Sequence, residues 1–122
     1  MVLTTPELVV VDSFGRSHRA TLPEYNVALA LQTLELVFSF QVEFAQGRRI
    51  RGGQVLDFLV YSPFPIPLQV YGEYWHEGQL AADDSLKLAQ LRTAFNHDVE
   101  IIWGKEALTP EDALSACRSI FT

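Results

Sequence analysis

Apolar and polar residues alternate from residue 38 to residue 44, with Phe or Val at every second position. This is the period of a half-buried strand. Residues 54–61 form a near-continuous apolar run, as expected of a central strand, and residues 68–71 form a shorter one. The intervening residues 62–67 contain three prolines and are expected to be a connection. Residues 99–103 predict one more buried strand.

Helical periodicity marks residues 23–35, 81–95 and 110 to about 121. Pro23 and Pro110 suit first helical turns, where their missing N–H groups cost nothing. After an N-terminal segment, the order is helix, two or three strands, helix, strand, helix. This order predicts a mixed α/β domain with a central sheet.

The first 22 residues are expected to be an arm or the remnant of a linker from a longer chain. They hold only a candidate strand at residues 8–11 and a candidate turn at residues 13–16. Residues 23–122 then form the domain. A chain of 122 residues with 48% hydrophobic residues suits one domain with its own core.

The net charge of −6 counts against a protein that coats nucleic acid non-specifically, because such proteins have basic surfaces. One local basic strip, formed by Arg48, Arg49 and Arg51, can still hold phosphates. No apolar run approaches the length of a membrane span, and the first residues lack the pattern of a signal peptide. We therefore expect a soluble intracellular protein.

Cysteine usage narrows the chemistry further. Cys117 is the only cysteine, so the chain has no internal disulfide. One cysteine is also too few for a Cys-based structural zinc site. It lies in the apolar stripe of the last predicted helix. It is therefore expected to be a buried core thiol rather than a nucleophile.

The charge within the central apolar run is Asp57, which lies between Leu56 and Phe58. Burial of an unpaired carboxylate is strongly unfavourable unless a metal ion or a hydrogen-bond donor compensates it. Two interpretations remain open. Asp57 is a metal ligand, or it forms a structural salt bridge with an arginine of the strip at residues 48–51.

Three further candidates lie near the ends of predicted elements. His76 follows the next strand and has acids on either side of it, in the segment 72–77. A histidine titrates near neutral pH, so it is a general base, a metal ligand or an ordinary surface residue. Glu24 and Asp84 begin the apolar faces of the first two helices, with Asp83 as a competitor for Asp84. A first-turn Glu24 is also what the helix dipole favours.

These segments resemble the active-site core of the Vsr-like nucleases, a branch of the PD-(D/E)XK superfamily. The branch includes the very-short-patch-repair DNA mismatch endonucleases and the EDxHD homing endonucleases. The resemblance rests on residues 52–58 and 68–76, and continues in Asp84-x-x-Lys87-x-x-x-Leu91 and in residues 99–103. It spans residues 23 to about 108. It implies a restriction-endonuclease-like fold, in which a central mixed β-sheet is flanked by helices.

The resemblance also implies how the centre works. Asp57 and the main-chain carbonyl of Val70 would hold Mg²⁺, or Mn²⁺ in its place, and His76 would act as general base on the attacking water. Asp84 would orient His76 or hold a metal-bound water, and Glu24 would have a similar outer role.

The other roles follow at the edge of this centre. The arginines of the 48–51 strip would bind backbone phosphates. Glu73 either replaces a missing strand acid or faces solvent. Tyr74 or Trp75 would pack under His76 or against DNA.

Two positions depart from the general PD-(D/E)XK pattern. That pattern places an acid and, two positions later, a lysine on the second strand, where this chain has Gln69 and Tyr71. The Vsr-like branch tolerates this, because a backbone carbonyl and a histidine replace the usual groups. One cysteine cannot build the zinc site of the patch-repair enzymes, so the homing or phage type is favoured.

We therefore expect a Mg²⁺-dependent endodeoxyribonuclease of prokaryotic or phage-like type that hydrolyses phosphodiester bonds. Its partner is DNA and not a membrane, and it would act as a homodimer or with an additional DNA-recognition domain. Two alternatives stay open. One is a catalytically silent DNA-binding or interaction module with a nuclease-like fold, which the acidic net charge favours. The other is a structure-specific nuclease for junctions or mismatches.

Overall fold

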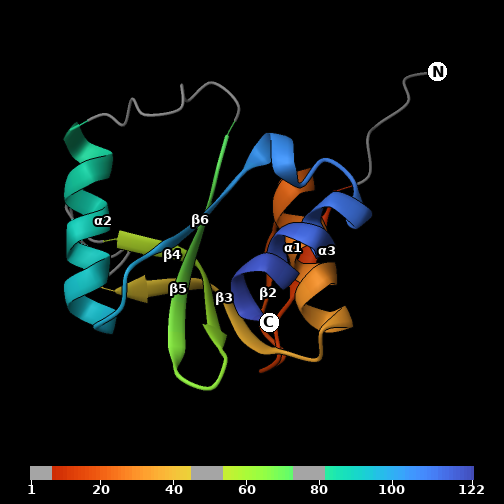
Figure 1. The fold of residues 1–122 in the computed structure, drawn as a ribbon, viewed down its shortest axis with the longest axis horizontal. Helices are drawn as coiled ribbons and strands as arrows, with labels where there is room; N and C mark the ends of the chain where they lie inside the picture. The colour runs from red at the N-terminus through yellow and green to blue at the C-terminus, as the bar shows by residue number, and fades with distance from the viewer. Residues whose placement is uncertain (1–6, 45–53, 73–81) are drawn as a thin grey trace.

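Helices lie on both sides of a mixed β-sheet (Figure 1). The computed structural model describes residues 7–44, 54–72 and 82–122, without the side chains of residues 54 and 82–85. The elements in chain order are β1 (Val9–Val11), β2 (Ser17–Arg19), α1 (Leu22–Thr33), β3 (Val37–Phe44), β4 (Gln54–Tyr61), β5 (Pro65–Tyr71), α2 (Ala82–Phe95), β6 (Glu100–Trp103), the 3₁₀ helix η2 (Gly104–Glu106) and α3 (Pro110–Phe121).

The main sheet has the strand order β3-β4-β5-β6. β4 is antiparallel to both β3 and β5, whereas β5 and β6 are parallel. A parallel pair needs a long crossover, and α2 lies in the segment between these two strands. The prediction of a mixed α/β domain with a central mixed sheet flanked by helices is confirmed. None of the described helices is long and apolar enough to cross a bilayer.

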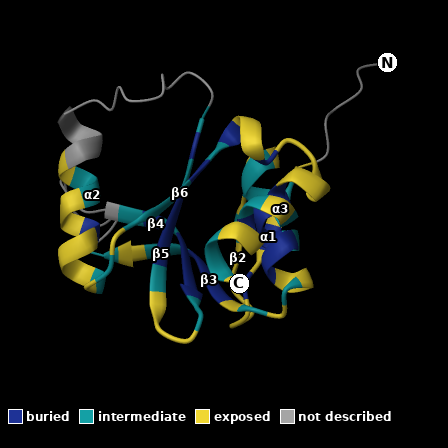
Figure 2. Ribbon diagram, viewed as in Figure 1, coloured by how far each residue is buried: buried dark blue, intermediate teal, exposed yellow. Residues whose placement is uncertain are grey.

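The apolar interior consists of two clusters on opposite faces of the sheet. The larger one joins the sheet to α1 and α3, and its fully buried members include Leu31, Phe38, Phe58, Leu68 and Ile102. The smaller one joins the sheet to α2 through Leu56, Leu59 and Leu91. Figure 2 shows buried residues along the strands and exposed residues on the outer side of α2.

Part of the way along β3 and β4, side chains that would face one side of the sheet face the other side instead. Residues two apart on a regular strand face the same side. Phe40 nevertheless packs in the larger cluster and Val42 against the smaller one, and Phe58 and Leu56 differ in the same way. Gln41, between the first pair, has φ 57°, which kinks β3 at this point. Asp57 lies between the second pair, so it occupies the place where the sheet changes faces.

The prediction that residues 62–67 form a connection is wrong in part. β5 begins at Pro65, and its antiparallel pairs with β4 include Tyr61–Pro65 and Leu59–Pro67. Alternate residues of a strand direct their N–H groups to the same neighbour. Because the two prolines are two positions apart, both can occupy places where a strand needs no N–H donor on that side.

The bounds of α1 and α2 differ from the prediction by one or two residues, and α3 spans the predicted residues. α1 begins at Leu22, and α3 begins at Pro110 behind the cap Thr109, whose hydroxyl accepts the Asp112 N–H. Cys117 of α3 is buried in the larger cluster, as predicted. Burial raises the pKa of its thiol to about 12, so the thiol stays protonated at neutral pH and is a poor nucleophile.

The described part of residues 1–22 is a hairpin that packs on the domain. The prediction for this segment was an arm or a linker remnant. β1 and β2 pair antiparallel, and Val10 of β1 is buried in the larger cluster. The turn between them places Gly15 at φ 81°, a conformation that glycine adopts without strain.

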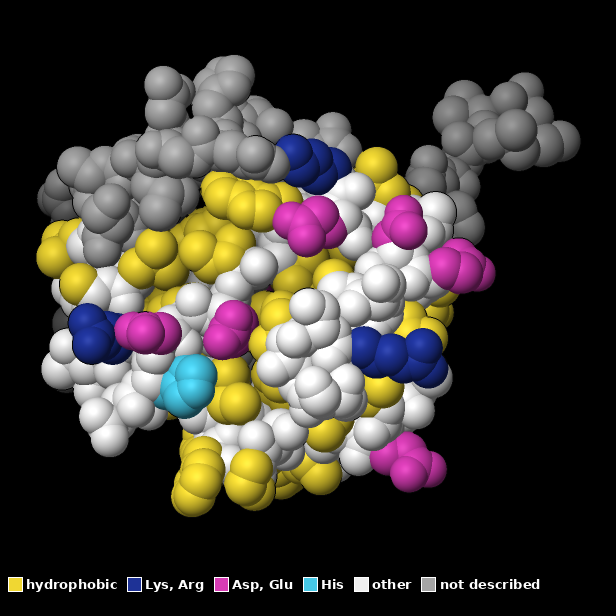
Figure 3. All heavy atoms as spheres, viewed as in Figure 1, with side chains coloured by type: hydrophobic (Ala, Val, Ile, Leu, Met, Phe, Trp, Pro, Cys, Tyr) yellow, Lys and Arg dark blue, Asp and Glu magenta, His cyan; other side chains and the backbone are white. Residues whose placement is uncertain are grey.

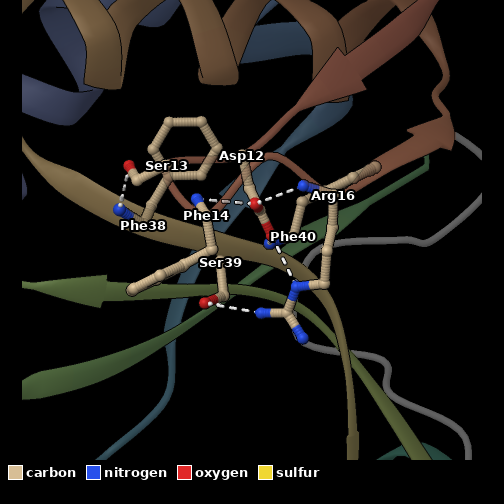
Figure 4. Close-up of polar contacts among 7 residues, drawn as sticks. All are labelled: Asp12, Ser13, Phe14, Arg16, Phe38, Ser39 and Phe40. Atoms are coloured by element: carbon tan, nitrogen blue, oxygen red, sulfur yellow. Dashed lines mark hydrogen bonds and ion pairs between the residues drawn. The ribbon is translucent and has the colours of Figure 1, made fainter.

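Asp12 fastens this hairpin to β3, an edge strand of the main sheet (Figure 4). Its buried carboxylate accepts the N–H groups of Phe14 and Arg16 at 2.9 and 3.0 Å, and that of Phe40 at 3.3 Å. The Arg16 guanidinium lies 3.4 Å from the same carboxylate. One side chain therefore closes the turn and satisfies a donor of the edge strand.

Candidate functional site

Asp57 lies where β4 and β5 separate. The antiparallel register of the two strands runs up to the pair Phe58–Leu68 and includes no residue before Phe58. At the next position, side chains make the contacts between the strands. The Val70 N–H donates to Asp57 Oδ2 at 2.9 Å, and the Asp57 N–H donates to Gln69 Oε1 at 2.8 Å.

The electrostatic surroundings of Asp57 oppose its ionisation. The pKa of its carboxyl group is raised from 3.8 to about 7, above all because burial removes solvent from the charged form. The Val70 N–H bond lowers the pKa, the charge of Glu24 raises it, and the charge of Lys87 lowers it. The balance leaves an acid that titrates near neutral pH in the absence of a compensating cation.

Glu24 and Lys87 should therefore shift the Asp57 carboxyl in opposite directions. Glu24→Gln is expected to lower the pKa of Asp57, because it removes a like charge, and Lys87→Met is expected to raise it, because it removes an opposite charge. Carboxyl-detected NMR titration of the metal-free protein measures both. The exposed Arg118 of α3 gives the matched control Arg118→Met, which should leave this pKa unchanged. Shifts of the same sign in the two test variants would contradict this electrostatic scheme.

Glu24 has a structural role that the sequence prediction did not include. Thr21 and Glu24 form a capping box at the start of α1: Thr21 N–H donates to Glu24 Oε1 at 2.9 Å, and Glu24 N–H donates to Thr21 Oγ1 at 3.3 Å. The side chain is partly buried and still close enough to Asp57 to raise its pKa. Glu24 is therefore both a helix cap and a charged neighbour of Asp57.

A hollow of about 410 Å³ lies beside this group of residues. It contains two of the predicted site residues, Glu24 and Val70, in a largely apolar wall. The lining residues are Thr21, Pro23, Glu24, Val70, Tyr71, Gly72, Gly104 and Leu108. The ring of Tyr71 packs on Trp103 of β6, with 5.6 Å between ring centroids. The hollow is therefore formed by the start of α1, the end of β5, the start of η2 and Leu108.

Several predicted site residues cannot be placed. His76, Glu73 and the arginines of the 48–51 strip lie outside the described residues. The main chain of Asp84 lies in the first turn of α2, and the side chains of Asp83 and Asp84 are outside the described part of the structure. Within the described ranges, no three His, Cys, Asp or Glu side chains come together as a metal-binding group.

Two residues near Asp57 had no predicted role. Lys87 was part of the quoted helix pattern, and the structure places its charge near Asp57. Gln69 was noted only as a departure from an acidic residue, and it is 1% exposed with its amide oxygen on the Asp57 N–H. The sequence carried a signal for each residue. Lys87 lies three residues after Asp84 in the quoted helix pattern, and Gln69 is a polar residue within a short apolar strand.

A second hollow, of about 590 Å³, lies at the C-terminal end of α2. Its described lining includes His97, whose Nδ1 is 2.6 Å from the Asp98 carbonyl, and the exposed ion pair of Arg92 with Asp98. None of the predicted site residues is in that lining. The 410 Å³ hollow near Asp57 is therefore the better candidate.

Comparison with known proteins gives no independent assignment. The chain matches no protein-family model, and neither a curated protein nor a solved structure matches it.

Proposed function

We propose that this protein is a metal-dependent endonuclease that hydrolyses phosphodiester bonds of DNA, with a restriction-endonuclease-like fold of the Vsr-like type. The observation that carries the proposal is the Asp57 carboxylate. It lies where two central strands separate, it is largely removed from solvent, and its pKa is about 7. A carboxyl group held in this way, next to a hollow, is typical of a functional site rather than of a structural ion pair.

The arrangement of the elements supports the proposal. In the resemblance, a glutamate begins an early helix, an aspartate follows on a strand, and an adjacent strand, a helix and a last strand come after it. Here Glu24 lies in α1, Asp57 in β4, Val70 in β5 and Asp84 in α2, and β6 follows next to β5. β4 and β5 are hydrogen-bonded neighbours, so Asp57 and Val70 lie side by side, as the proposed metal ligands must.

The residues at this place fit a hard divalent cation. Mg²⁺ and Mn²⁺ prefer oxygen ligands, and Mg²⁺ retains several waters, so one carboxylate and one carbonyl are sufficient protein ligands. Asp57 and the Val70 carbonyl would hold the ion. Bound there, the ion supplies a positive charge that keeps Asp57 ionised and stabilises charge that develops on a phosphate group.

The remaining roles belong to side chains of this chain. His76 would accept the proton of the attacking water, because imidazole titrates near the working pH. Asp84 would orient His76, and the arginines of the 48–51 strip would bind phosphates. In Figure 3 the Lys and Arg side chains on the described part of the face in view lie apart from one another, with Asp and Glu side chains between them. A basic strip from residues 48–51 therefore matters to the proposal.

Two observations favour the alternative of a catalytically silent module. Glu24 already has a structural partner in the capping box, and the strand next to Asp57 carries the amide Gln69 instead of an acid. In that case Asp57 and Gln69 would serve only to join β4 to β5. The same protein would then bind DNA or a partner without cleaving it.

A cleavage assay separates these functions. Supercoiled, linear, nicked, mismatched and branched DNA are incubated with the full chain and Mg²⁺ or Mn²⁺, and matched reactions contain a chelator. We expect cleavage that requires the metal and a preference within the panel that identifies the substrate form. His76→Ala should lower the rate by a factor of at least about 100, because a general base contributes roughly that much.

The control is His97→Ala, which removes a histidine of the second hollow. It should cleave like the parent. Equal cleavage by His76→Ala and the parent would show that His76 is not the base. A parent that cuts none of the DNA forms with either metal would favour the silent module.

A further inference from the structure

Gln69 is a buried polar residue in the middle of the apolar strand β5. Its neighbour Leu68 is fully buried, and Gln69 itself is 1% exposed. A primary amide costs free energy when it leaves water unless it forms hydrogen bonds in the interior. Its oxygen atom Oε1 accepts the Asp57 N–H at 2.8 Å. The burial of Gln69 is therefore tied to one position on the neighbouring strand.

The Asp57 N–H lies at a place where the sheet no longer provides a regular partner. The β4–β5 register runs only up to Phe58–Leu68, one residue away from Asp57. On the other side, β3 kinks at Gln41, between the register pairs Phe40–Phe58 and Val42–Leu56. A buried N–H group must still be satisfied, and the side chain of Gln69 supplies the acceptor.

The contact is reciprocal. The Asp57 main chain donates to the Gln69 side chain, while the Val70 main chain donates to the Asp57 side chain at 2.9 Å. Two side chains thus replace the main-chain ladder at this position. The pair fixes the Asp57 main chain and, through it, the direction of the carboxylate, which lies against the main chain of Val70.

We infer that Gln69 is a positioning residue: its amide oxygen holds the Asp57 main chain where β4 and β5 separate, so that the carboxylate and the Val70 carbonyl can take one divalent cation between them. This inference rests on the proposed function. Gln69 does not bind the cation itself. It acts through Asp57. This role explains why an amide occupies a place where an apolar side chain would be buried at a lower cost in free energy.

The test uses Mn²⁺ as the probe and three variants of the full chain. Gln69→Leu removes the acceptor at similar volume, Gln69→Glu keeps an oxygen acceptor, and Gln32→Leu is the control at an exposed glutamine of α1. Three quantities are measured: the hydrogen-exchange rate of the Asp57 amide, the Kd for Mn²⁺, and the Mg²⁺ dependence of cleavage as separate kcat and half-saturation values.

We expect Gln69→Leu to raise the Mn²⁺ Kd about 10- to 100-fold, the usual effect of losing a partner that orients a metal ligand. Its Asp57 amide should exchange faster, while the amides of Phe58 and Val60 stay protected. Gln69→Glu should keep the amide protection of the parent, because its carboxylate oxygen still accepts the Asp57 N–H. Gln32→Leu should match the parent in every measurement.

Two different results would overturn the inference, and they distinguish failure of the Gln69 role from failure of the proposed function. If the parent binds Mn²⁺ and cuts DNA, and Gln69→Leu agrees with it within twofold, only the role of Gln69 is lost. If the parent neither binds Mn²⁺ nor cuts DNA, the proposed function is lost and the role with it. Gln69→Asn, whose shorter amide cannot reach the Asp57 N–H, replaces Gln69→Leu if that variant does not fold.

Discussion

Asp57→Asn is expected to make the metal-free protein more stable at pH 8 and, under the proposed function, to reduce metal-dependent cleavage to background. Asparagine has nearly the same shape and keeps an oxygen acceptor for the Val70 N–H, but it carries no charge. A rise in pKa from 3.8 to about 7 corresponds to a cost of roughly 4 kcal/mol for ionising the folded state, at 1.36 kcal/mol per unit. We expect a gain in unfolding free energy of about 2–4 kcal/mol.

The pH dependence of this effect has a definite sign. Folded Asp57 keeps its proton up to about pH 7, whereas the unfolded chain loses it near pH 3.8. Between these values the folded state binds more protons, so the stability of the parent falls as the pH rises. Asp57→Asn lacks this loss, and the difference between the two proteins should grow from pH 4 to pH 8.

Urea unfolding at several pH values with a chelator present measures the difference. Glu106→Gln, which removes one negative charge from an exposed residue of η2, is the control and should follow the parent in both stability and cleavage. Mg²⁺ should stabilise the parent but not Asp57→Asn. A variant that is less stable than the parent at pH 8 would show that the buried carboxylate is compensated in the metal-free state.

Asp12→Ala is expected to lower the unfolding free energy by about 3–5 kcal/mol. The change leaves the N–H groups of Phe14, Arg16 and Phe40 without their acceptor, and the Phe40 N–H is buried. Each buried donor that loses its partner costs about 1–3 kcal/mol. Because one of the three belongs to β3, the effect should reach the main sheet as well as the hairpin. Chemical denaturation at constant pH measures it.

Asp98→Ala is the matched control, because it removes a carboxylate whose partner, Arg92, is also exposed. Exposed ion pairs contribute little, so this control should change the stability by less than about 1 kcal/mol. The loss of stability in Asp12→Asn should lie between those of the two Ala variants. Its amide keeps one oxygen acceptor but places its NH₂ group against an N–H group that needs an acceptor. Equal effects of Asp12→Ala and Asp98→Ala would mean that the hairpin does not contribute to the stability of the domain.

Much of the fold was predictable because period and composition act locally. The alternation at residues 38–44 and the apolar run at 54–61 predicted β3 and β4, since burial on one face or on both selects these patterns. The prolines at 65 and 67 were misinterpreted, because proline disfavours a strand only where its missing N–H is required. That requirement depends on the neighbouring strand, which local sequence does not specify.

The site was predictable only as far as single residues carry a chemical signal. Asp57 was conspicuous as a charge in an apolar run, and the structure places it beside Val70. The role of Gln69 was not visible, because it arises from a gap in the register between two strands. The capping box of Glu24 was also missed, although Thr21 stands three residues before it. These features depend on geometry that pairs residues across elements.

The division of the apolar interior into two clusters has a thermodynamic consequence. Proteins open in cooperative units, and a unit with few buried apolar residues opens at a lower free energy than the whole molecule. Among the described side chains of α2, Leu91 alone is buried, in the smaller cluster. α2, and Lys87 with it, is therefore expected to open at a lower free energy than the elements that pack in the larger cluster. The Lys87 charge then lies near Asp57 only in the fraction of molecules in which α2 is closed. A ligand that binds the closed form more tightly raises that fraction.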